Sequence, residues 1–111
     1  MSSINNLIVR AEGVGRYAAD LAHELREGVA VSPGSNAHHP GDDTGRLVLD
    51  AYRTHGAEEM KSVVKGYQAG YNARAQELGD DHVRWVQIKN GIGWALPGAT
   101  EAEHAAIPAA L

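Results

Sequence analysis

The stretch Asp43–Leu78, DTGRLVLDAYRTHGAEEMKSVVKGYQAGYNARAQEL, decides the fold of this chain. It contains no proline, and its bulky apolar residues follow one drifting stripe with helical steps of three and four: Leu49, Tyr52, Met60, Val63, Val64, Tyr67, Tyr71 and Leu78. The spacing predicts a single helix over 43–78, roughly 54 Å long at 1.5 Å per residue. A helix of that length exceeds the needs of a small domain, so we expect it to lie against a second long helix.

Small residues interrupt this stripe. Gly66 and Gly70 stand four apart, and Gly56 lies on the stripe itself between Tyr52 and Met60. Without a side chain, glycine lets another backbone approach closely, although an exposed position tolerates it equally well. We favour close packing against a second helix at these positions.

The partner for the long helix lies earlier in the chain. Residues 4–29 carry apolar side chains at alternating steps of three and four, the spacing of helices that pack side by side: Ile4, Leu7, Ala11, Val14, Ala18, Leu21 and Leu25. Gly13 and Gly15 weaken the front of this segment, so we expect a regular helix over about 11–29, with Asn6–Arg10 extended. The segment 32–42 is rich in Pro, Gly, Ser and Asn and predicts a loop. The sequence thus predicts an all-α fold, an antiparallel hairpin of two long helices within residues 1–81.

Residues 82–111 form a predicted C-terminal arm with two possible structures. Tyr71, Leu78, Trp85 and Ile92 are spaced by seven, which favours a helix continued to about Lys89. The alternative is a small β-hairpin, because Asn90-Gly91 between apolar runs is typical of a tight hairpin turn. Farther on, Thr100 and Glu103 form a T-x-x-E capping box before a short alanine-rich turn. We expect this last segment to be loosely attached.

Composition narrows the function classes. The chain has 111 residues, a formal net charge of −4 and ten scattered Lys and Arg, which speaks against a nucleic-acid partner. It has no cysteine, and no run approaches the roughly 20 apolar residues of a membrane span. The N-terminus lacks the pattern of a secretory signal, so we expect the cytoplasm or export by a non-classical route.

Two groups of residues are candidate metal sites. His55 with Glu58 and Glu59 has helical spacing and would need Glu24 or Glu27 opposite it; surface ion pairing explains these residues better. His38 and His39 lie near Asp42 and Asp43 in the predicted loop, without further ligands at a defined spacing. No nucleotide-binding fingerprint or catalytic triad is present. We therefore predict no metal, no cofactor and no enzymatic activity.

Two motifs resemble the EspC-like branch of the W-x-G superfamily, the small helical hairpins of type VII (ESX) secretion. The opening Asn6–Gly15 is similar to that branch's N-L-x-V-x-x-E-x-L-G start, and Gly41-Asp42-Asp43-Thr44-Gly45 with Tyr52 is similar to its G-D-x-x-G…Y entry into the second helix. The interhelical turn has Pro33-Gly34-Ser35 where the family usually carries W-x-G, and Trp85 with Lys89 stands where the family's Y-x-x-x-D/E export signal is expected. The resemblance implies a secretion-associated protein that dimerises through its helices.

Because two amphipathic helices cannot bury all their apolar faces alone, we expect a protein partner: a homo- or heterodimer of helical hairpins. The residues predicted to form the interface are Leu7, Val14, Leu21, Leu25, Tyr52, Met60, Val63, Tyr67, Tyr71, Trp85 and Trp94. Two other functions remain open. One is a structural subunit of a virion or similar particle that docks on its neighbours through the C-terminal arm, and the other is a small helical protein that binds a metal or ligand.

Overall fold

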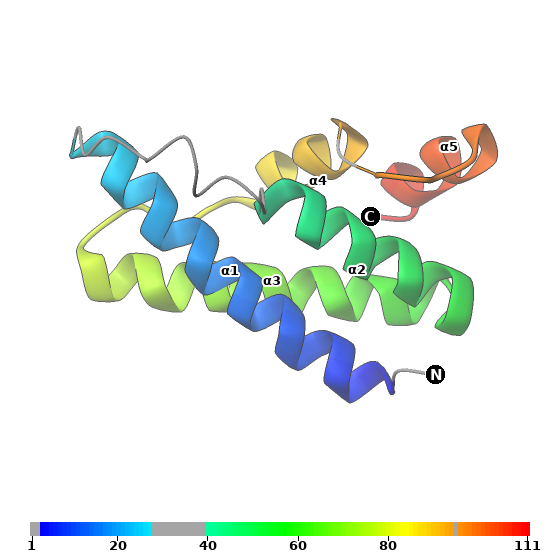
Figure 1. Ribbon diagram of the computed structural model, residues 1–111, viewed down its shortest axis with the longest axis horizontal. Helices are drawn as coiled ribbons and strands as arrows, with labels where there is room; N and C mark the ends of the chain where they lie inside the picture. Colours follow the sequence, from blue (N-terminus) through cyan, green and yellow to red (C-terminus); the bar gives the residue numbers. More distant parts are fainter. Residues whose placement is uncertain (1–2, 28–39, 95) are drawn as a thin grey trace.

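The computed structural model describes residues 3–27, 40–94 and 96–111, apart from the side chains of residues 40–42 and 94. These residues form five helices: α1 (Ile4–Arg26), α2 (Pro40–His55), α3 (Ala57–Leu78), α4 (Trp85–Trp94) and α5 (Glu101–Ala110) (Figure 1). The predicted all-α class is confirmed, and the described residues include no strand. None of the described helices is long and apolar enough to cross a membrane.

The predicted single helix over 43–78 is wrong, because the chain reverses direction at Gly56. This residue has φ 94° and ψ 179°, a conformation that strongly favours glycine, and it separates α2 from α3. Its N–H still donates to the carbonyl of Tyr52 at 3.1 Å, and its carbonyl accepts from Met60 N at 3.0 Å. Both helix ends thus stay hydrogen-bonded through the reversal. The predicted hairpin of two long helices is replaced by three helices that pack together (Figure 1).

Helix α1 begins earlier than predicted. Ser3 is its N-cap, with the hydroxyl accepting a hydrogen bond from Asn6 N at 3.2 Å, and residues 6–10 are helical rather than extended. Leu7 is fully buried on this first turn. The cap and this burial outweigh the cost of Gly13 and Gly15, about 1 kcal/mol each.

Helices α1 and α3 run in the same direction and cross at glycines. A Cβ added at Gly15 would collide with the backbone of Tyr67 and Tyr71, and one at Gly70 would collide with the backbone of Glu12. At Gly66 the nearest atoms would be the Ile8 side chain and carbonyl, both at 3.1 Å. The predicted close approach at Gly66 and Gly70 is therefore confirmed, and the neighbouring helix is α1.

Ion pairs follow the same seam toward the ends of both helices. Arg74 pairs with Asp20 at 2.6 Å, and Arg16 with Glu77 at 2.8 Å. Asp80, just beyond α3, accepts from Arg26 at 3.0 Å, and its Oδ2 lies 2.9 Å from His23 Nδ1. Partial burial alone would raise the pKa of Asp80, but its contacts with His23 and Arg26 outweigh that effect and lower it.

Helix α3 does not continue to Lys89. Gly79 adopts φ 76°, and the N–H groups of Gly79 and Asp80 bond back to the carbonyls of Gln76 and Ala75, which closes the helix with a Schellman motif. Asn72 then holds the connection, with its side-chain oxygen accepting from Val83 N at 2.7 Å. The alternative β-hairpin is wrong as well, since Asn90 and Gly91 lie inside helix α4.

The C-terminal segment is docked on the rest of the molecule rather than loosely attached. Ile107 of α5 is fully buried and shares one core with residues of every other helix and with Leu96 between α4 and α5. The helical residues of this core are Leu7, Ala11, Leu47, Val48, Leu49, Ala51, Met60, Val63, Val64, Ile88 and Ile92. Trp85 Nε1 donates to the carbonyl of Leu111 at 2.9 Å. The predicted capping box of Thr100 and Glu103 is present.

A bidentate ion pair joins α5 to the end of α2. Arg53 donates from Nε and Nη2 to the two carboxylate oxygens of Glu103 at 2.7 and 2.8 Å, and from Nη2 to the carbonyl of Gly98 at 3.1 Å. The hydrogen bonds from Arg53, together with one from the backbone of Thr100, lower the pKa of Glu103 from 4.5 to about 2.

This pKa shift predicts a contribution to stability that depends on pH. A carboxyl group with a lowered folded-state pKa stabilises the fold fully above its unfolded value of 4.5, and the contribution disappears as the pH falls through about 2. We expect Glu103→Gln to lower the melting temperature at pH 6 and to have progressively less effect between pH 4.5 and 2. Thermal unfolding of both proteins across that range measures this, and a pH-independent difference would contradict the assignment.

Candidate interaction groove

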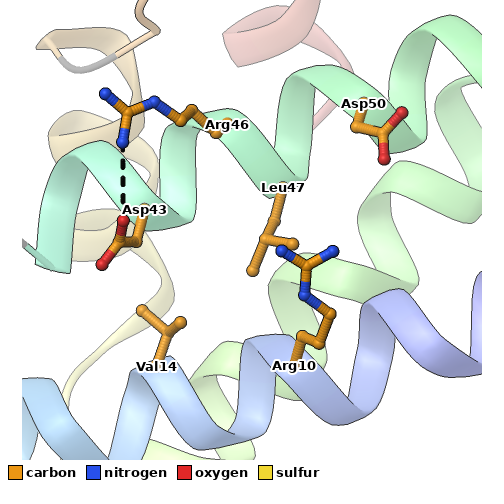
Figure 2. A pocket seen from close by; sticks show the side chains of 6 residues that line it. All are labelled: Arg10, Val14, Asp43, Arg46, Leu47 and Asp50. Carbon is orange, nitrogen blue, oxygen red and sulfur yellow. Dashed lines mark ion pairs between the residues drawn. The ribbon is translucent and has the colours of Figure 1, made fainter. Parts of the chain in front are cut away.

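An open cavity of about 530 Å³ lies between α1 and α2. Arg10 and Val14 line it from α1, and Asp43, Arg46, Leu47 and Asp50 line it from α2 (Figure 2). We refer to these six residues as the α1–α2 groove. Their positions show that α1 and α2 are antiparallel, since Val14 lies beside the start of α2 and Arg10 lies farther along it.

Helical periodicity gathers these side chains on facing surfaces. Arg10 and Val14 are four residues apart on α1, and Asp43, Leu47 and Asp50 follow steps of four and three on α2. Seven residues from Asp43 to Asp50 span about 10.5 Å of helix axis, so the groove is about two turns long. Figure 2 shows Val14 and Arg10 pointing toward α2, and Leu47 pointing from α2 toward α1.

The groove has an apolar floor and charged edges. Leu47 is buried and Val14 half-buried, while Arg10 and Arg46 are exposed. Asp43 pairs with Arg46 at 3.5 Å along α2, and this contact contributes little to stability because the Arg46 side chain is exposed to solvent. None of the ion pairs among the described residues includes Arg10 or Asp50, and both side chains line the groove.

The predicted interface residues fall into four groups, the last of which is aromatic. Leu7, Met60 and Val63 are at most 1% exposed, so they pack inside the chain and present no surface to a partner in this conformation. Three residues lie on α1. Val14 lines the groove, Leu21 is half-buried, and Leu25 is 62% exposed. Trp94 has its side chain outside the described residues.

The remaining aromatic residues pack against the chain itself. Tyr52, Tyr67, Tyr71 and Trp85 are all half-buried. The rings of Tyr67 and Tyr71 lie 6.4 Å apart at a tilt of 38°, and burial raises the pKa of Tyr67 to about 12. Trp85 is held by its bond to Leu111, so its polar edge serves an internal contact.

The metal site considered at His55, Glu58 and Glu59 does not form among the described residues. Gly56 interrupts the helical spacing between His55 and Glu58, and no group of three or more His, Asp or Glu comes together in the described parts of the chain. Glu58 and Glu59 are exposed in the first turn of α3. His38 and His39 lie outside the described residues.

Sequence reasoning missed five of the six groove residues: Arg10, Asp43, Arg46, Leu47 and Asp50. The signal was present in the steps of four and three from Asp43 through Leu47 to Asp50, which place two carboxylates beside one leucine. The predicted stripe follows Leu49 and Tyr52 instead and passes over Leu47, which belongs to the same core as Leu49.

Comparison with known proteins gives no relative. No family model, no curated protein and no solved structure matches the chain.

Proposed function

We propose that this chain is a non-enzymatic helical interaction protein that binds another protein along the α1–α2 groove. The observation that carries the proposal is the groove itself, whose apolar floor of Val14 and Leu47 is bordered by charged side chains. An apolar centre with a polar rim is the usual anatomy of a protein–protein contact. A groove between two helices is also a common site for a third helix.

The pKa shifts support a binding role over a catalytic one. Functional acids and bases usually have perturbed pKa values inside a cleft. Among the described residues the two largest shifts belong to Glu103, which pairs with Arg53, and to Tyr67, which is half-buried beside Tyr71. Neither residue lines the groove, and both shifts come from contacts that hold the fold together.

The resemblance to type VII secretion proteins suggests the kind of complex. In this proposal α1 and α2 are the antiparallel hairpin that the resemblance implies, and α4 and α5 are the arm folded back on it. The complex would then be a heterodimer in which a second helical protein covers the groove.

Site-specific photocrosslinking tests this function. A photoreactive aromatic residue in place of exposed Arg10, at the edge of the groove, is expected to give a discrete crosslinked species in the cells that make the protein. The matched control carries the same residue in place of exposed Lys65 on α3. Crosslinks from neither position, or equal crosslinks from both, would count against a partner at the groove. Circular dichroism of both variants checks that they fold.

A further inference from the structure

The charges and shape of the α1–α2 groove narrow the chemistry of its partner. This inference rests on the proposed function. We infer that the groove takes an amphipathic helix of a different protein, one that carries acidic side chains on one flank of its apolar face and basic side chains on the other.

The charge pattern is the first argument. Arg10 stands on the α1 edge, and Asp50 stands on the α2 edge, with Arg46 about one turn away and its partner Asp43 about two. A helix lying in the groove meets a guanidinium on one side and a carboxylate on the other. An acidic flank would pair with Arg10 and a basic flank with Asp50, whereas like charges on both flanks would face repulsion on one side.

The apolar floor is the second argument. Val14 and Leu47 lie between the charged edges, so an apolar side chain of the incoming helix has a place to be buried. The groove spans about two turns, which matches anchors spaced by three, four and seven residues on a helix. An extended or polar segment would leave the half-buried Val14 in contact with water.

The shape argues against a second copy of this chain. Two copies facing each other through a concave groove would leave both floors unfilled. The apolar faces of the described helices are also already used, since Leu7, Val48, Met60, Ile88 and Ile107 pack in the chain's own core. The large apolar side chains that remain exposed among the described residues are scattered over two helices: Val9, Tyr17, Leu25 and Val86.

Three helical peptides of about 15 residues, all with the same leucine face, test the inference. The first has glutamates on one flank and lysines on the other, the second has glutamates on both, and the third has lysines on both. Fluorescence anisotropy measures their Kd for the folded protein. We expect the mixed peptide to bind most tightly. Each ion pair that a uniformly charged peptide cannot form should raise its Kd by up to about fivefold.

Charge reversal supplies the decisive comparison. Arg10→Glu makes both edges acidic and should favour the all-lysine peptide, while Asp50→Lys makes both basic and should favour the all-glutamate peptide. The inference would be overturned if the wild type and both variants ranked the three peptides in the same order. It would also be overturned if no peptide bound the wild type with a Kd below about 1 mM. Self-association of the wild-type protein that Arg10→Glu abolishes, seen by analytical ultracentrifugation, would also overturn it in favour of a second copy. If position 10 still crosslinks to a partner but the protein shows no preference among the peptides, this inference fails and the proposed function stands.

Discussion

Gly70→Ala is expected to lower the melting temperature by roughly 5–15 °C, because α1 and α3 cannot keep their present separation around an added methyl group. The new Cβ would lie 2.8 Å from both Cα and the carbonyl carbon of Glu12 and nearer still to its oxygen. These are backbone atoms of α1, so no side-chain rotation can relieve the overlap. The helices must move apart at the centre of their seam, at a cost of about 1–3 kcal/mol. Thermal and denaturant unfolding measure it.

Gly13→Ala is the matched control on α1. A Cβ at Gly13 has no atom within 4 Å, so alanine there meets no neighbour and improves helix propensity. We expect the free energy of unfolding to rise by about 0.5–1 kcal/mol. If the two glycine variants changed stability in the same direction and by a similar amount, the close crossing of α1 and α3 would be refuted.

Ile107→Ala is expected to cost about 2–5 kcal/mol, the usual range for removing most of a buried aliphatic side chain. Ile107 is 0% exposed, and it connects α5 to a core shared with α2, α3 and α4. The loss of local stability should be greatest in α5, so hydrogen exchange of residues 101–110 should accelerate more than that of α1. Denaturant unfolding gives the total change in stability.

Val86→Ala provides the comparison for Ile107. Val86 is an apolar residue of α4 that is 51% exposed, so its truncation should change stability by no more than about 0.5 kcal/mol. A similarly small effect at Ile107 would mean that the C-terminal segment is loosely attached, as its sequence suggests.

Local signals in the sequence proved the most informative about the fold. The capping box of Thr100 and Glu103 joins residues three apart, and the close spacing of Gly66 and Gly70 marks the surface that α1 approaches; the structure confirms both. No local signal of this kind predicts the reversal at Gly56. Tyr52, Gly56 and Met60 keep helical spacing across the break, so the apolar pattern is the same for one straight helix and for two packed ones. Tertiary packing decides between them.

The groove was hidden for a related reason. Its residues come from two helices whose relative placement depends on that reversal, and charged residues on a helix usually indicate an exposed face. The tail was misjudged because Ile107 is the single large apolar residue between Leu96 and Leu111. One buried side chain and the Arg53–Glu103 pair help to dock α5, and neither contact has a local sequence signature.

The parallel course of α1 and α3 also affects how the chain folds. Contacts along their seam join residues far apart in sequence, with separations of 54, 57 and 61 positions for Asp20–Arg74, His23–Asp80 and Arg16–Glu77. A simple up-and-down bundle forms its main contacts between neighbouring helices. Here a long loop must close before the tightest helix pair can form, and the entropy of that closure is lost before the contact stabilises anything. Helix α2, which packs on both partners, shortens the search by bringing the start of α3 back beside α1.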